Sequence, residues 1–388
     1  MNTFDFPIHC TLKSAARFPD MRPPRKKSTR FSRVLRIGLL AAVLLFILIS
    51  LVATKIIYDK QFPRYDRPDQ FTTAQLRYSD IEADYARRLV SFTSGNNLLQ
   101  GYIYGVDNTR GLMVVAHGLG GGADSYLPQI IHFVDQGFRV FAYDCTGSYD
   151  SEGKTTRGFP QSVVDLQAAL TFIAAQPTLS GLPLLLFGHS WGGYAVANVL
   201  NYPHDIKGVI SVSGVDTAID IIIEQGRTFM GGFIYTQFPF LWLYQRILYG
   251  KVAAFNAVDA LNATGVPALI IHGMADELVD YDGSALIARK DEIINPRVSF
   301  ITVDEPGRDG HNNIFKSDAA ISYIEEINRE YRYLYDSHNG QIPYDQKKSF
   351  YDGLDRFLVQ DLNPNLMQVI DGFIDSLVPG TNLIDETF

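Results

Sequence analysis

The chain has 388 residues, of which 46% are hydrophobic and 20% are charged. This composition is typical of a globular protein with a large core and argues against a disordered chain. The formal net charge is −8, yet the first 36 residues hold nine Lys or Arg against two Asp. The remainder is therefore strongly acidic, which argues against nucleic acid as a partner, because phosphate binding needs a basic surface.

An uncharged apolar run, IGLLAAVLLFILISLVAT, stands near the N-terminus between Arg36 and Lys55. As a helix it would span roughly 27 Å at about 1.5 Å per residue, close to the thickness of a bilayer core. We expect a transmembrane helix over residues 34–57, preceded by a disordered basic tail over 1–33 and followed by a membrane-proximal linker over 58–85. A buried core helix and a cleaved signal peptide are the alternatives. The long leader before the run argues against the second.

Lys and Arg are denser before this run than after it. The positive-inside rule then predicts a single-pass protein of the cell membrane, with a cytoplasmic N-terminus and an extracytoplasmic main domain. The two cysteines, Cys10 and Cys145, would lie on opposite sides of the membrane. We therefore expect neither a disulfide nor a cysteine-type zinc site.

A regular pattern begins near residue 86. The first stretch predicts a β-hairpin turned at residues 95–97. Beyond it, short apolar runs alternate with helical patterns of ten or more residues, which indicates an α/β fold with a mostly parallel, doubly wound sheet. The expected strands are GLMVVAHG, FRVFAYD, PLLLFGHS, IKGVISVSG, VPALIIHG and PRVSFITV. The expected helices are ADSYLPQIIHFVDQG, QSVVDLQAALTFIAAQ, WGGYAVANVLNY and a segment near 280–294.

Two further segments complete the expected organisation. Residues 217–266 are too long for a plain crossover and should form a small cap of their own. The main domain should end near residue 335, so that it covers 86–335. Residues 336–388 then predict a helical extension, in which two amphipathic helices pack on the main domain.

The stretch LLLFGHSWGGYAVANVL places a serine between glycines, in the order Gly188-x-Ser190-x-Gly192, where a strand meets a helix. Such a tight turn holds its middle residue in a strained backbone conformation with the side chain exposed, and the residues two positions away must be small. This arrangement favours Ser190 as a nucleophile over a structural turn, although the glycine pattern alone could arise by chance. We expect the indole of Trp191 to shape the pocket under the cap.

A serine hydroxyl needs a base, and in such folds the acid and the histidine follow the serine in the chain. Asp276 in IIHGMADELVD and His311 in DEPGRDGHNNIF each follow a predicted strand. The carboxyl ends of parallel strands meet at one edge of the sheet. His189 lies inside the turn and faces the wrong way, and His272 precedes Asp276 by only four residues. The rival acids are Glu277, Asp280, Asp304 and Asp216.

The loop VVAHGLGGGADSY follows the first parallel strand. A tetrahedral intermediate needs backbone N–H donors, which this loop and the residue after the nucleophile usually supply. Leu119 and Trp191 are the expected donors, and Gly118 and Gly120 let the loop turn its amides inward.

The same loop fits a second pattern. The spacing Gly118-x-Gly120-x-x-Ala123, with Asp144 at the end of the next strand, is that of a dinucleotide-binding turn. An NAD-binding oxidoreductase is therefore an alternative. It accounts for the glycines but leaves the serine motif and the later acid and histidine unexplained.

Five strings, AHGLGG, AYDCTGSYDSEG, GHSWGGY, IHGMADELV and GHNNIF, resemble the α/β-hydrolase superfamily, in its branch of serine aminopeptidase-like and monoacylglycerol-lipase-like hydrolases. The resemblance covers about residues 86–335 and implies a Ser190–Asp276–His311 triad under a cap over 217–266. In the second string Thr146 stands where the family has Arg, a departure expected to affect substrate fit.

The resemblance implies hydrolysis through an acyl-enzyme, without a metal or other cofactor. The expected partners are a small acyl substrate, lipid-like or a short peptide, and the membrane. An ester is the favoured substrate and a peptide or amide bond the runner-up. A binding protein that has lost catalysis is a remaining alternative.

Overall fold

The computed structural model describes residues 30–380 of the chain. The chain forms two compact units, which divide between Ile49 and Ser50. Most of the tail expected over 1–33, and Cys10 with it, lies outside the described residues. Residues 30–33 are already helical, so the first helix begins earlier than expected.

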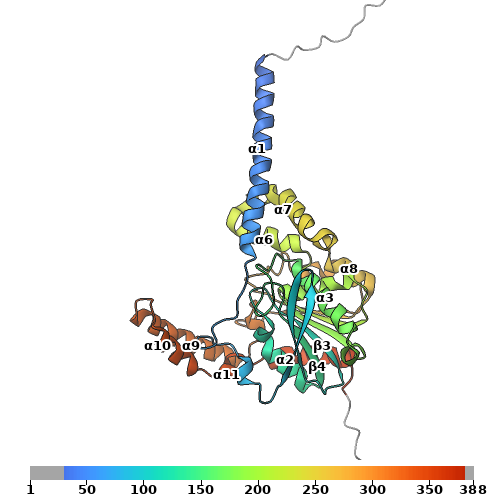
Figure 1. The fold of residues 1–388 in the computed structure, drawn as a ribbon, viewed down its shortest axis with the longest axis vertical. Helices are drawn as coiled ribbons and strands as arrows, with labels where there is room; N and C mark the ends of the chain where they lie inside the picture. Colours follow the sequence, from blue (N-terminus) through green and yellow to red (C-terminus); the bar gives the residue numbers. More distant parts are fainter. Residues whose placement is uncertain (1–29, 381–388) are drawn as a thin grey trace, which may run out of the picture. The chain divides into compact units, whose positions relative to one another are not determined.

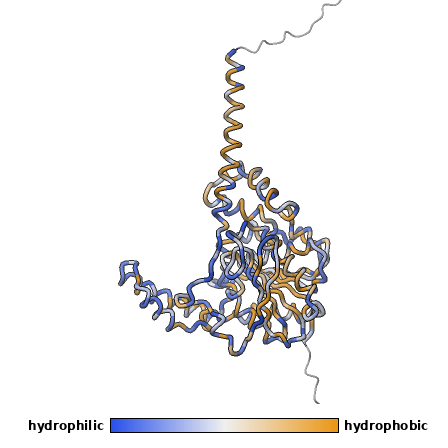
Figure 2. Tube along the Cα trace, viewed as in Figure 1, coloured by the Kyte–Doolittle hydropathy of each residue, from blue (hydrophilic) through white to orange (hydrophobic). Residues whose placement is uncertain are grey.

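The first helix, α1 (Arg30–Gln61), is long and apolar enough to cross a membrane, with a mean hydropathy of 2.8 over its most apolar window. Figure 2 shows the hydrophobic colouring along most of its length. It extends into the segment expected as a linker, and its last part belongs to the second unit, where Tyr58 is buried. A membrane anchor and a signal sequence near the N-terminus both meet this criterion of length and hydropathy.

An eight-stranded sheet forms the centre of the second unit, in the order β1-β2-β4-β3-β5-β6-β7-β8 (Figure 1). Its strands are β1 (Arg87–Ser94), β2 (Asn97–Tyr104), β3 (Gly111–Ala116), β4 (Phe138–Tyr143), β5 (Leu184–His189), β6 (Ile206–Val212), β7 (Ala268–Gly273) and β8 (Val298–Val303). At one edge β1 pairs antiparallel with β2, and β2 pairs antiparallel with β4. All the other neighbouring strands, from β4 through β3 to β8, pair parallel. The predicted fold class is thus confirmed.

Helices cover both faces of this sheet, because its strands are apolar on both sides. Alternate residues of β3 enter different cores: Leu112 and Val114 lie in one, and Met113 and Val115 in the other. The first core contains residues of α3 (Gln161–Ala174), α4 (Pro177–Ser180), α5 (Trp191–Asn198) and α8 (Ala257–Thr264). The second contains residues of α2 (Leu127–Asp135) and α12 (Pro364–Leu377).

The prediction of a helix near 280–294 is wrong. That segment contains only a 3-10 helix, Leu286–Glu292, which follows a series of turns. The turns are fixed by contacts with another part of the chain: Glu224 accepts hydrogen bonds from the amides of Asp280 and Ser284. A distant side chain therefore holds these residues in a conformation that their local pattern does not indicate.

Between β6 and β7 the chain forms α6 (Ala218–Met230), a 3-10 turn (Gly231–Phe233), α7 (Ile234–Tyr249), a second 3-10 turn (Gly250–Ala254) and α8. Only the part before α8 forms a cap, because α8 packs against α5 as a helix of the main domain.

The C-terminal part contains α9 (Asp318–Ser337), α10 (Tyr344–Asp352), α11 (Arg356–Val359) and α12. Helix α12 packs on the sheet as expected, with Leu366 and Ile370 in the second core. Helix α10 instead packs against α9, where the rings of Phe350 and Tyr331 lie 5.3 Å apart.

Candidate active site

Ser190 lies between β5 and α5, in the tight turn that the glycine pattern predicts. Its φ of 56° and ψ of −115° lie in a region that non-glycine residues rarely adopt. The flanking glycines allow this turn: a Cβ on Gly188 would overlap the carbonyl of Gly192, and a Cβ on Gly192 would overlap that of Ala116. Strain of this kind persists where the surrounding structure enforces it, as in a nucleophile elbow.

Asp276 and His311, which follow β7 and β8, meet at the same edge of the sheet. The Nδ1 atom of His311 lies 2.9 Å and 2.7 Å from the two carboxylate oxygens of Asp276. A carboxylate only accepts hydrogen bonds, so Nδ1 carries the proton and Nε2 is left free to take one. The His311 ring is tilted against the ring of His189, the residue before Ser190, with the two centroids 4.8 Å apart. The Asp276–His311 pair therefore lies beside the elbow.

Asp276 is buried and ionised. Burial opposes ionisation, but hydrogen bonds from His272, from His311 and from the Val279 amide hold the pKa of Asp276 well below its usual range. The backbone amides of Leu278 and Val279 donate to Oδ1 at 3.0 Å and 2.8 Å. An ionised, fixed carboxylate can orient the His311 ring and stabilise its protonated form.

His272, whose place four residues before Asp276 predicts no catalytic role, lies fully buried beside this carboxylate. Its Nε2 atom is 3.2 Å from Oδ2 of Asp276 and 3.0 Å from the carbonyl oxygen of Val279. Both neighbours only accept, so Nε2 carries a proton and holds Asp276 from the side away from its turn. The sequence feature that could have predicted this contact is a histidine near the end of a buried strand, a few residues before an acid.

The rival acids have other roles. Glu277 accepts a hydrogen bond from the His311 backbone amide at 3.0 Å, and Asp216 accepts from the first amides of α8. Asp280 and Asp304 are exposed. Asp276 is the only one of these five acids that contacts the His311 ring.

The loop after β3 passes close to Ser190. A Cβ built on Gly118 would lie 3.6 Å from the Ser190 Cβ, which places the two segments in contact. His117 holds the Gly118 carbonyl, with Nδ1 at 2.7 Å, and accepts from the Cys145 amide at Nε2. Because a trans peptide points its C=O and N–H in opposite directions, this contact turns the Leu119 N–H away from His117.

Trp191 is the other expected donor. It is the first residue of α5, where amides have no partner within the helix. The Trp191 indole is fully buried and donates to the Phe159 carbonyl at 2.7 Å. The expectation that this indole shapes the pocket under the cap is therefore wrong.

A buried chain of hydrogen bonds joins these parts. The Gly118 amide donates to the hydroxyl of Tyr126 at 3.0 Å, and that hydroxyl lies 2.7 Å from Nδ1 of His189. Nε2 of His189 lies 3.0 Å from the backbone carbonyl of His311. A carbonyl only accepts, so His189 carries its proton on Nε2 and Tyr126 donates to Nδ1. Burial lowers the pKa of His189 to about 3, which keeps it neutral and this direction fixed.

Replacement of Tyr126 by Phe should therefore lower kcat by about tenfold and the free energy of unfolding by about 1–3 kcal/mol, because two buried polar groups lose their partner. Tyr194→Phe is the matched control, since the Tyr194 hydroxyl is buried without a protein partner among the described residues. Steady-state kinetics and thermal unfolding of both variants measure these effects. Equal values of kcat and of unfolding temperature in the two variants would contradict a positioning role for this series of hydrogen bonds.

The segment after α1 packs on the loop that follows β4. Arg64 donates to the carbonyls of Tyr149, Ser151 and Gly153 at 2.5 to 2.9 Å. Thr146, which stands where the family has Arg, is fully buried and donates from its amide and hydroxyl to Asp165. Thr146 therefore has a structural role. The guanidinium that contacts this loop comes from Arg64, in the segment after α1.

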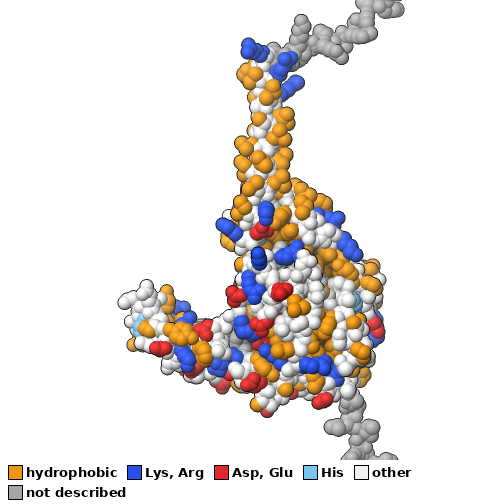
Figure 3. Space-filling model, viewed as in Figure 1, with side chains coloured by type: hydrophobic (Ala, Val, Ile, Leu, Met, Phe, Trp, Pro, Cys, Tyr) orange, Lys and Arg blue, Asp and Glu red, His pale blue; other side chains and the backbone are white. Residues whose placement is uncertain are grey.

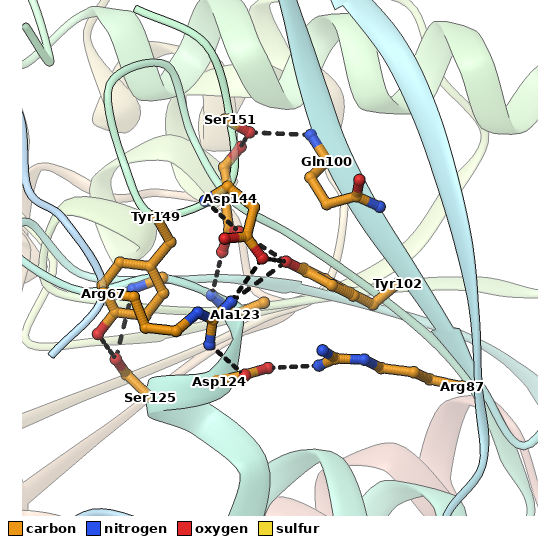
Figure 4. Close-up of polar contacts among 12 residues, drawn as sticks. Arg67, Arg87, Gln100, Tyr102, Ala123, Asp124, Ser125, Asp144, Tyr149 and Ser151 are labelled. Atoms are coloured by element: carbon orange, nitrogen blue, oxygen red, sulfur yellow. Dashed lines mark hydrogen bonds and ion pairs between the residues drawn. The ribbon is translucent and has the colours of Figure 1, made fainter. Parts of the chain in front are cut away.

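Figure 4 shows the adjoining network, in which Arg67 and Arg87 both pair with Asp124. Arg67 also pairs with Asp150. A cavity of about 220 Å³ lies beside it and is lined by linker and loop residues, not by Ser190, Asp276 or His311.

Asp144, the acid of the dinucleotide alternative, lies within the same network. It accepts from the Ala123 amide at 2.7 Å and the Tyr102 hydroxyl at 2.8 Å. These contacts use its carboxylate to fix the loop, and α2 begins only at Leu127, beyond a 3-10 turn. The geometry gives the oxidoreductase interpretation no support.

Comparison with known proteins agrees with this geometry. The family model of the serine aminopeptidases S33 matches residues 107–247. Polyketide transferase af380 of Aspergillus fumigatus is 26% identical over 121 residues, which cover 30% of this chain and 41% of that protein. The chain thus spans about two fifths of this relative.

Among solved structures, Pyrococcus furiosus esterase Pf2001 has a TM-score of 0.48 at 16% identity, over 75% of this chain and 98% of the esterase. Pyrococcus horikoshii acylaminoacyl peptidase has a TM-score of 0.43 at 16% identity, over 61% of this chain and 39% of the peptidase. Over residues 107–247 the chain is therefore similar to the serine aminopeptidases S33, and its mostly parallel sheet and its serine elbow agree with that likeness.

Proposed function

We propose that this protein is a membrane-anchored serine hydrolase that cleaves carboxylic esters through an acyl-enzyme. The observation that carries the proposal is the pairing of His311 Nδ1 with buried Asp276 beside the strained elbow at Ser190. This arrangement leaves Nε2 of His311 as a base at the edge of the sheet where the serine is presented.

The proposed reaction follows from these positions. Ser190 Oγ attacks the acyl carbon while His311 Nε2 takes the hydroxyl proton, and the amides of Leu119 and Trp191 stabilise the oxyanion. His311 then protonates the leaving alcohol, which departs and leaves an ester on Ser190. Water, deprotonated by His311, attacks that ester and releases the acid and the free serine. Asp276 stays ionised throughout and orients the ring.

We further propose that α1 anchors the chain in the cell membrane through residues 34–57, with the N-terminus in the cytoplasm and the hydrolase domain outside. The apolar length of α1 and the excess of Lys and Arg before it support this orientation. The proposed substrates are small acyl compounds, among which lipid-like esters suit an enzyme held at a membrane.

One labelling experiment tests both proposals. A fluorophosphonate that does not cross membranes should label the full chain in intact cells, and Ser190→Ala should abolish the label. Labelling only after permeabilisation would reverse the orientation, and a folded wild-type protein without label would contradict the hydrolase mechanism. A series of esters and matched amides of graded acyl length then compares the ester substrate with the amide alternative through kcat/KM.

A further inference from the structure

The helices α6 and α7 and the turn between them expose several large apolar side chains. Phe229 is 79% exposed and Ile247 is 69% exposed, values that are unusual for such residues in a water-soluble surface. Other apolar residues of α7, Ile234 and Leu241, are buried in the core, so the helix is apolar on its inner and outer sides. The exposed set, called here the cap face, comprises Phe229, Phe233, Tyr235, Phe238, Trp242, Leu243 and Ile247.

The charge of this segment differs from the rest of the domain. No Asp or Glu occurs between Glu224 and Asp259, although the chain contains 42 acidic residues. The cations in the interval are Arg227, Arg246 and Lys251. The Arg246 guanidinium lies over the Trp242 ring at 5.6 Å. Figure 3 shows hydrophobic and basic side chains together over the cap helices.

Helix α7, which carries most of the cap face, contacts the end of the apolar helix. The Tyr244 hydroxyl donates to Asp59 at 2.7 Å, and the Tyr244 ring packs edge-on against Tyr58, with centroids 5.2 Å apart. Residues 50–61 of α1 and the cap belong to the same compact unit. The end of the apolar helix therefore packs against the same helix, α7, that exposes Tyr235, Phe238 and Trp242.

We propose that the cap face binds the boundary between headgroups and acyl chains of the membrane in which α1 is anchored. Aromatic side chains concentrate at this depth of a bilayer, and a helix with exposed apolar and basic residues and no acids binds anionic lipid surfaces. The inference rests on the anchoring proposed above and adds a second lipid contact, made by the hydrolase domain itself.

The proposed contact of the cap face with lipid affects catalysis because α6 is hydrogen-bonded to the segment that follows Asp276. Glu224 accepts from the amides of Asp280 and Ser284, and Gln225 donates to the Leu278 carbonyl at 2.6 Å. A cap held at the lipid boundary thus brings the candidate active site close to membrane-borne acyl compounds.

The chain's two tryptophans provide the test, since Trp191 is fully buried and Trp242 is 44% exposed. The full chain is reconstituted into bilayers of phosphatidylcholine and phosphatidylglycerol with brominated acyl chains, and Trp emission is compared with that in unbrominated bilayers. We expect bromine to remove at least about half of the Trp242 emission, because interfacial side chains lie within reach of the acyl chains. Trp242→Phe should remove the quenching, since only Trp191 remains.

Three outcomes would overturn the proposal. Quenching of Trp242 by aqueous acrylamide but not by bromine would place the cap face in water. Protection from both quenchers would indicate a second copy or another protein as the occupant. A chain that does not float with the vesicles at alkaline pH would contradict the anchoring itself, while labelling of Ser190 would still report the hydrolase activity separately.

Charge-reversal variants test the electrostatic part. Arg227→Glu with Lys251→Glu should reduce bromine quenching in bilayers that contain phosphatidylglycerol and leave it nearly unchanged in pure phosphatidylcholine. Lys154→Glu with Lys290→Glu changes the net charge equally at exposed positions outside the cap face and should have no effect. Equal effects of the two pairs would contradict a basic contact made by the cap.

Discussion

Replacement of Asp276 by Asn is expected to lower kcat for a soluble ester by about 10³–10⁴-fold with little change in KM, an effect of the size that loss of the acid has in other triads. The amides of Leu278 and Val279 both bind Oδ1 of Asp276 and would keep the Asn oxygen in that position. The Asn amide nitrogen would then replace Oδ2, which at 2.7 Å is the nearer carboxylate oxygen to Nδ1 of His311, with Oδ1 at 2.9 Å.

An amide nitrogen donates and does not accept, so His311 would move its proton from Nδ1 to Nε2. Nε2 could then no longer take the proton of Ser190, and acylation would fail while substrate binding remained. Burst kinetics with a chromogenic ester and the rate of fluorophosphonate labelling measure this step. Asp280→Asn is the control, because Asp280 is a nearby rival acid with an exposed carboxylate. If Asp276→Asn kept more than about a tenth of wild-type kcat, the acid of the triad would have to be sought elsewhere.

The succession of strands along the chain and the position of the elbow could be predicted because each depends on local sequence. Short apolar runs bounded by turns indicate buried parallel strands, and the glycines around Ser190 are required by backbone contacts that form within a few residues. Asp276 and His311 could be chosen because parallel strands end at one edge of the sheet, so residues far apart in the chain meet there.

The contacts that arise only on folding were not predictable in this way. Among the histidines, His189 and His272 were set aside for their sequence positions, yet folding brings one under the carbonyl of His311 and the other against Asp276. The guanidinium of Arg64 likewise reaches the loop after β4 from a segment more than eighty residues earlier in the chain. No local pattern records such pairings, because each depends on where a distant backbone group comes to lie.

A second large effect is expected at Gly192, where substitution by Ala should remove most folded protein. A Cβ at this position would overlap the backbone carbonyl of Ala116 at the end of β3. No side chain can move to relieve that overlap, so either β3 or the elbow must shift. Backbone conflicts of this kind account for the rare losses above about 4 kcal/mol, which approach the whole stability of many domains.

Gly372→Ala is the matched control, since the same methyl group is added in the exposed interior of α12 with no atom within 4 Å. Ala is preferred over Gly in a helix by about 1 kcal/mol, so this variant should be slightly more stable than wild type. Thermal unfolding of both variants in detergent, read by near-ultraviolet circular dichroism, measures the contrast. A folded Gly192→Ala protein with wild-type labelling at Ser190 would show that the elbow can open without loss of function. In that case the close contact of β3 with α5 would not be what holds Ser190 in its strained conformation.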